Sequence, residues 1–167
     1  LKVYIMINNY LSAGGFKIQV KRLPHVEFFS NKVLLPSVTT NAVKSETPLR
    51  SFYSVGDHIS YADLDLTFIV DENMSNYIEI YSWLRAFGTP ETLESYDKLN
   101  KSIDGLTSDI SVVILNSQKN PNIEATFTNC FPVGITPVSL DLSNADVSYV
   151  EATVTIRYDQ FDIKQLS

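Results

Sequence analysis

The ten residues from Tyr61 to Val70 alternate between two kinds of side chain, and this alternation constrains the fold more than any other feature of the chain. One set is apolar and consists of Ala62, Leu64, Leu66, Phe68 and Val70. The other set, apart from Ile69, is polar and includes Asp63 and Asp65. A period of two residues is typical of a β-strand, because successive side chains point to opposite sides of a sheet. The pattern therefore predicts a strand at 60–70 with one buried face and one hydrated, acidic face.

The order of the other expected elements favours a mainly β (α+β) fold. Strands are expected at 16–21, 26–35, 110–115, 123–131 and 147–158, and helices at 74–87 and 90–103. Strands, two helices and more strands do not form the regular β–α alternation of a parallel sheet. We expect one domain over residues 1–167, an antiparallel β-sandwich or barrel with a flanking α-helix, preceded by an N-terminal segment at 1–12.

The expected helix at 74–87 has an apolar stripe that favours packing on the sheet. The stripe consists of Met74, Tyr77, Ile78, Tyr81 and Leu84, extended by Trp83 and Phe87. Such spacing is typical of an amphipathic helix. A ligand pocket around Trp83 is an alternative, but aromatic residues at helical spacing more often belong to a core. Asn73 is the expected N-cap, with Asp71 and Glu72 at the positive end of the helix.

Residues 36–57 have little periodicity and are expected to form a long loop. They are rich in Ser, Thr and Asn, with Pro48 and Gly56 near their end. A connection of this length in a folded domain usually has a function or is disordered. Its apolar patch indicates that it packs on something, and consists of Leu49, Phe52, Tyr53 and Val55.

Charge and cysteine content exclude several functions. Thirteen basic and nineteen acidic residues give a net charge of −6, which argues against a surface that binds nucleic-acid phosphates. A protein that lies close to nucleic acid without adhering to it stays possible.

The single cysteine, Cys130, excludes an internal disulfide and a multi-cysteine metal site, and is interpreted as a small apolar residue rather than a nucleophile. The apolar N-terminal stretch is too short to span a bilayer and lacks the features of a signal peptide, so a soluble intracellular product is expected.

No pattern of catalytic residues is evident. His25 and His58 have no partner in the sequence. Asp63 and Asp65 admit interpretation as a glycosidase-like pair, but two neighbours on one strand face do not flank a substrate, so a hydrated acidic face is the better interpretation. Asp71 and Glu72 lack the loop of a calcium site. The sequence therefore predicts no enzyme, no metal and no cofactor.

Two blocks of the chain resemble the tail tube proteins of contractile-tailed bacteriophages, together with related tube-like baseplate and tail-end components. The first block is 48–72, with Arg50, the pair Gly56-Asp57 and the acidic strand, followed by a helix that carries Trp83. The second runs from Phe131-Pro132 through 140–142 to a closing strand that ends at Tyr158-Asp159. The chain departs from the family plan in segment 1–12, in the long loop 36–57 and in a polar second helix.

The resemblance implies a structural subunit of a bacteriophage tail tube. Hexameric rings would stack around a lumen through which genomic DNA passes without specific binding. The implied partners are the chain itself, the tail sheath, and baseplate or tail-end proteins, with no membrane involved. The implied location is the virion tail, assembled in the host cytoplasm.

The resemblance also implies roles for individual residues. Antiparallel hairpins of neighbouring subunits would pair edge to edge into one ring-shaped barrel around the lumen. Strands 26–35 and 60–70 would form one lumen hairpin, and 110–115 with 123–131, or with the final strand, a second. The lumen-facing acidic wall would consist of Asp63, Asp65 and Glu27, whose carboxylates repel DNA phosphates. The inter-subunit loop would dock on a neighbouring subunit or ring through Leu49, Arg50, Phe52, Tyr53 and Val55. The helix would lie outside the barrel, towards a sheath.

Other identities stay open at this stage. A baseplate initiator, a tail terminator ring and a secretion-system tube share the same architecture. A different class, a monomeric β-sandwich that binds a ligand through tyrosine and tryptophan, is also admissible because the chain has nine tyrosines.

Overall fold

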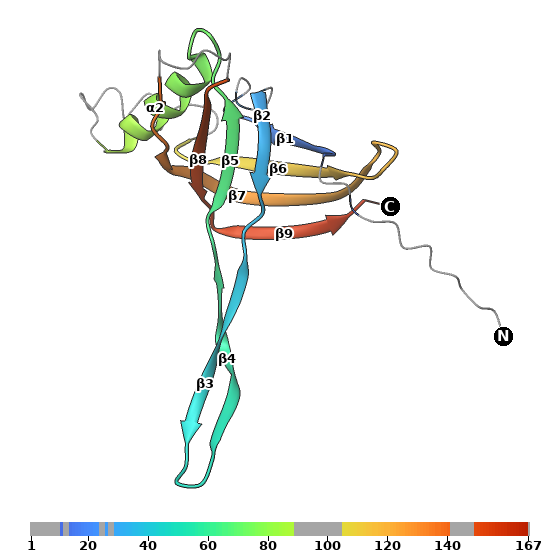
Figure 1. Ribbon diagram of the computed structural model, residues 1–167, viewed down its shortest axis with the longest axis vertical. Helices are drawn as coiled ribbons and strands as arrows, with labels where there is room; N and C mark the ends of the chain where they lie inside the picture. The colour runs from blue at the N-terminus through green and yellow to red at the C-terminus, as the bar shows by residue number, and fades with distance from the viewer. Residues whose placement is uncertain are drawn as a thin grey trace, which may run out of the picture.

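The computed structural model describes residues 11, 14–23, 26, 29–88, 105–140 and 149–166. It consists of a body of antiparallel strands with one helix, from which a long β-hairpin projects along the longest axis (Figure 1). The elements are β1 (Phe16–Val20), β2 (Ser30–Leu34), β3 (Val38–Glu46), β4 (Ser51–Tyr61), β5 (Leu64–Ile69), α2 (Ser75–Gly88), β6 (Ser108–Leu115), β7 (Pro121–Ile135), β8 (Glu151–Arg157) and β9 (Gln160–Gln165).

The long strand β7 joins the two layers of the body. The strand order is β1-β6-β7-β8-β5-β2, with β9 also paired to β7. The first part of β7 pairs with β6 and β9, and its last part pairs with β8. Between them the register shifts, and Asn129 has a φ of 55°. This kink lets one strand take part in both layers. The antiparallel strands and the single described helix α2 confirm the expected mainly β fold with a flanking helix.

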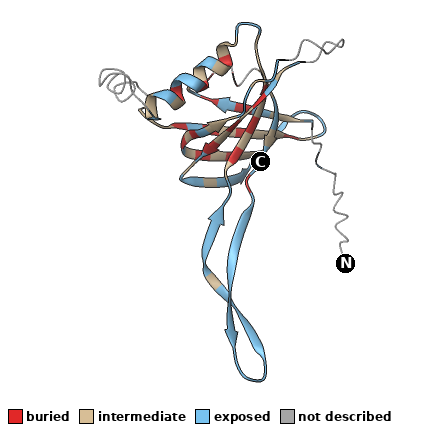
Figure 2. Ribbon diagram, turned by 60° about the vertical axis from the view of Figure 1, so that its left-hand side comes forward, coloured by how far each residue is buried: buried red, intermediate tan, exposed pale blue. Residues whose placement is uncertain are grey.

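The alternation in β5 places its apolar side chains in the core. Leu64, Leu66 and Phe68 are fully buried, whereas Asp65 and Thr67 on the opposite face are half-buried. Alternate residues of β8 are buried against them in the same way. Figure 2 shows that the buried residues lie in the body and on the inner side of the helix. The predicted division into an apolar and an acidic face is therefore confirmed within β5, whereas Ala62, expected on the buried face, is exposed and precedes the strand.

Several expected strand boundaries are wrong. The strand at 60–70 is two strands, because β4 ends at Tyr61 and β5 begins at Leu64. Val26 and Phe29 have helical backbone, so only the second half of the strand expected at 26–35 exists, as β2. β7 continues to Ile135, and β9 was not expected from the sequence. The expected helix at 90–103 and the segment at 1–12, apart from residue 11, lie outside the described residues.

The helix α2 faces the core with a different set of side chains from the one expected. Its buried residues are Asn76, Ile80 and Trp83. Tyr77, Leu84 and Phe87 pack against the core as half-buried residues, whereas Ile78 and Tyr81 are exposed. The stripe was wrongly placed because a buried asparagine, which no apolar pattern detects, lies on the inward face. The core interpretation of Trp83 is confirmed.

The turn between β5 and α2 is held by Asn76. Its Nδ2 donates to the Ile69 carbonyl at 2.8 Å, and its Oδ1 accepts from the backbone N–H of Asp71 at 3.3 Å. The helix begins at Ser75 with no acidic residue in its first turn, so Asp71 and Glu72 belong to the turn. The expected Asn73 N-cap is therefore wrong.

Residues 36–57 are not a loop but most of an extended hairpin, β3–β4. The two strands pair antiparallel from Val38 opposite Tyr61 to Glu46 opposite Ser51. None of their residues is buried in the chain (Figure 2). The sequence pattern is weak because neither face of the hairpin meets a core, so neither face is selected to be uniformly apolar.

Candidate functional site

The projecting hairpin exposes apolar side chains on both of its faces. By the register, Tyr53 and Val55 share one face, and Phe52 lies with Val43 on the other. Val55 is 90% exposed and Tyr53 71%. A two-stranded hairpin is marginally stable in water by itself, and long strands with unpaired edges associate readily with other chains. These properties are those of an interaction element rather than of a monomer surface.

The tip of the hairpin is ordered by local hydrogen bonds. Thr47 and Arg50 exchange backbone hydrogen bonds at 3.1 and 3.2 Å, and the Thr47 hydroxyl donates to the Arg50 carbonyl at 2.6 Å. The Arg50 guanidinium lies 5.0 Å from the centre of the Phe52 ring. Leu49, between the fixed ends of this turn, is 98% exposed. The structure thus places the five expected inter-subunit residues between the middle of the hairpin, at Val55, and its tip, and their role stays a prediction.

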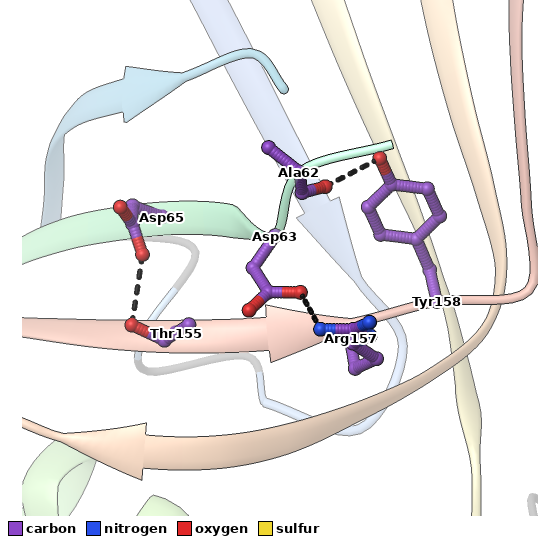
Figure 3. Close-up of polar contacts among 6 residues, drawn as sticks. All are labelled: Ala62, Asp63, Asp65, Thr155, Arg157 and Tyr158. Carbon is purple, nitrogen blue, oxygen red and sulfur yellow. Dashed lines mark hydrogen bonds and ion pairs between the residues drawn. The ribbon is translucent and has the colours of Figure 1, made fainter. Parts of the chain in front are cut away.

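An aromatic cluster fixes the base of the hairpin to the body. The Phe127 ring stacks on Phe161 with centroids 4.8 Å apart, and Tyr61 of β4 meets Phe161 edge-on at 6.5 Å. The Tyr158 hydroxyl donates to the Ala62 carbonyl at 2.8 Å (Figure 3). Burial raises the pKa of Tyr158, so the hydroxyl stays a donor over a wide pH range. The role of Phe161 was missed because β9 carries no clear alternation.

Asp63 and Asp65 each interact with a residue at the C-terminal end of β8. Arg157 Nη1 donates to Asp63 Oδ1 at 2.7 Å, and the Thr155 hydroxyl donates to Asp65 Oδ1 at 2.8 Å (Figure 3). The two carboxylates have separate partners along the strand and do not flank a cleft together. This arrangement supports an outer sheet face over a catalytic pair.

The outer face of β2, β5 and β8 carries charges of both signs. Alternation and register place Lys32, Glu151 and Arg157 on the same side as the two aspartates. Among the described residues of this face, three carboxylates therefore oppose two cations, which leaves one net negative charge. Glu27, the third expected acidic residue, lies outside the described residues.

Cys130 is a core residue. It is fully buried, and burial raises the pKa of its thiol from 9.0 to about 12. A thiol of this pKa is protonated at neutral pH and is a poor nucleophile. The interpretation of Cys130 as a small apolar residue is confirmed.

Neither a cluster of metal-ligating side chains nor a membrane-spanning helix is found in the described part of the chain. No three acidic, histidine or cysteine side chains there are grouped so that they could hold an ion. Within the same residues, no helix is long and apolar enough to cross a bilayer.

Solved structures of contractile injection systems share this fold. The chain is similar to the anti-feeding prophage tube-terminating cap, with a TM-score of 0.69 and 13% identity over 97% of this chain and 95% of that one. It is also similar to a chain of the anti-feeding prophage baseplate, with a TM-score of 0.61 and 15% identity over 95% and 97%. A chain of the PVC sheath–tube complex in the extended state gives a TM-score of 0.60 and 16% identity over 96% and 95%.

The fold is therefore the one found in the tubes, caps and baseplates of contractile injection systems. The phage tail tube protein family matches residues 2–164, and the chain belongs to this family. Comparison with curated protein sequences gives no match. The resemblance based on blocks 48–72 and 131–159 is thus confirmed, and the family is one of structural tube components rather than of enzymes.

Proposed function

We propose that the chain is the repeating subunit of a bacteriophage tail tube, in which six copies close into a ring and rings stack around a DNA-conducting lumen. The observation that carries this proposal is the β3–β4 hairpin, which has exposed apolar side chains on both faces and no core of its own. Assembly supplies the missing partner surface. Head-to-tail contacts that close give a ring, and a second set that does not close gives a stack.

The edges of the sheet support ring formation. β2 ends the strand order on one side, with β8 and β5 between it and β7. An unpaired edge strand is a hazard that closure into a larger barrel removes. We assign the face that carries Asp63 and Asp65 to the lumen, because most of its outward side chains, apart from Leu34 and Ile69, are polar and it has a net negative charge. Its repulsion of DNA phosphates is moderate, since Arg157 partly neutralises Asp63.

The role of a tail tube subunit also determines the partners of the chain and its place in the virus particle. The subunit contacts the tail sheath and the baseplate or tail-end proteins, and it is assembled in the host cytoplasm and resides in the virion tail. Genomic DNA passes without specific binding. No cofactor is required for this role.

Size-exclusion chromatography with light scattering, followed by negative-stain microscopy of the purified chain, tests assembly. Rings or tubes with a central hole of duplex width are expected. A stable monomer of 18.8 kDa would contradict the proposal and favour the ligand-binding sandwich.

Reversal of charge on the sheet face tests the lumen assignment. In phage particles, we expect Asp65→Lys to slow genome delivery, because a cation in the channel attracts phosphate. Asp162→Lys is the matched control, since Asp162 is an exposed acidic residue on β9. Unchanged delivery with Asp65→Lys in intact tubes would refute the lumen role of this face.

A cap at the end of the tube is a second candidate function. It is supported by the likeness in fold to the anti-feeding prophage tube-terminating cap, with a TM-score of 0.69, and to a chain of the PVC sheath/tube terminator, whose TM-score of 0.60 equals that of the sheath–tube chain. A cap closes into single rings without stacking, whereas the main tube protein forms long tubes from purified material. Tube length in the microscopy above distinguishes the two.

A further inference from the structure

We propose that an apolar pocket at the end of the body opposite the hairpin receives the hairpin tip of a second copy of this chain. The proposal rests on the proposed function, and it names the acceptor site through which one ring would hold the next.

The pocket lies between the turn that precedes α2 and the segments that flank β7 and β8. It has a volume of about 490 Å³. Among the described residues that line it, most are apolar, and these include Val70, Met74, Val138, Leu140, Tyr149 and Val150. Leu140 and Tyr149 are exposed large side chains. An apolar pocket bordered by exposed apolar residues is a favourable site for an apolar anchor from another chain.

The floor of the pocket is preformed. The Val70 N–H donates to the Val150 carbonyl at 2.8 Å, which joins the ends of β5 and β8. Asn76 is fully buried and holds the preceding turn through Ile69 and Asp71. Met74 has a φ of 54°, an uncommon backbone conformation for a residue with a side chain. A site held in this way loses little conformational entropy when it is filled.

The pocket and the hairpin tip lie at opposite ends of the molecule. In Figure 1 the turn between β5 and α2 is at the top of the long axis, and the tip of β3–β4 is at the bottom. Two copies placed end to end in the same orientation therefore bring the tip of one to the pocket of the other. Such a contact uses different surfaces on the two copies and repeats without closing.

The tip and the pocket are complementary in polarity and charge. Leu49 is the most exposed large apolar residue of the hairpin, and the neighbouring Arg50 carries a positive charge. The pocket offers an apolar lining, and Asp71 and Glu72 add two carboxylates to it. Leu49 thus supplies the apolar anchor, while Arg50 pairs with a carboxylate at the rim.

A pair of cysteines, Leu49→Cys with Tyr149→Cys, tests the contact in assembled protein. After oxidation, a head-to-tail contact between rings links every copy to one above and one below, so non-reducing electrophoresis shows a ladder that continues beyond six copies. Each single variant stays at the position of the monomer. Cys130 does not interfere, because it is fully buried.

Three results would overturn the proposal. Dimers from Leu49→Cys alone would show that the tips meet each other, and a ladder that ends at six would place the contact within a ring. Intact tubes without any cross-link would show that the tip lies elsewhere. Failure of the proposed function is a separate result, because the unmodified chain would then form no rings at all.

Exchange of charge tests the same contact without a covalent bond. We expect Arg50→Glu and Glu72→Arg each to reduce sedimentable tube by about tenfold, the effect of losing one charge-assisted contact. The double variant should recover most of the loss, since the pair is restored with reversed signs. Full assembly of either single variant, or two losses without recovery in the double variant, would refute the pairing.

Discussion

Substitution of Gly56 by alanine should disable the hairpin while leaving the body intact. A Cβ atom at this position would lie 1.9 Å from the carbonyl oxygen of Asn41 on the paired strand, and that atom belongs to the backbone. The approach is short of ordinary van der Waals contact by about 1.5 Å. The strands must therefore separate, and hydrogen bonds of the ladder around Asn41, worth about 0.5–1.5 kcal/mol each, are lost.

The body should not respond to this change, because no residue of β3 or β4 belongs to the core. We expect the unfolding free energy of the body to change by less than about 0.5 kcal/mol, while tube formation falls strongly. Denaturant unfolding and negative-stain microscopy measure the two quantities on the same preparation. Gly88→Ala is the control, since its added Cβ meets no atom of the described residues within 4 Å, apart from its chain neighbours and the backbone of its own helix. Normal tubes from Gly56→Ala would refute the role assigned to the hairpin.

Three further predictions concern the body. Phe127→Ala should cost about 3–5 kcal/mol in denaturant unfolding, because a fully buried ring that stacks on Phe161 is removed; a loss below 1 kcal/mol would contradict the packing. Tyr158→Phe removes the hydrogen bond to the Ala62 carbonyl and should lower the unfolding free energy by about 0.5 kcal/mol, since the bond is exposed. Amide exchange at the base of β4 should become faster, and unchanged exchange there would show that the bond does not hold the hairpin. The Cys130 thiol, with its pKa raised from 9.0 to about 12, should react with iodoacetamide at pH 8 only after unfolding, and rapid alkylation of the folded protein would contradict its burial. The stability that this thiol contributes to the fold is complete below pH 9 and falls as the pH rises towards 12.

The sequence predicts the body of the fold because that part obeys simple periodicity. β5 and β8 each have one face in the core, so alternate residues are apolar, and their positions are nearly correct. β6 and the start of β7 are clear for the same reason. The pairing of β6 with β7 matches the expected second hairpin.

Other features depend on contacts that a local pattern does not encode. The hairpin at 38–61 has no buried face, so its strands resemble a polar loop in sequence. Asn76 lies at a core position because it completes the hydrogen bonds of a turn, and polar residues are not expected there. The ion pair of Asp63 with Arg157 joins residues far apart in sequence, so the charge of the acidic strand is lower than its composition indicates.

A cryo-EM reconstruction of the purified, assembled protein tests the central claim most directly. The account predicts a ring of six copies, with the face of β5 that carries Asp63 and Asp65 towards the axis and the β3–β4 hairpin covered by other copies. A reconstruction in which that face points outwards, or in which the hairpin stays in solvent, would contradict it.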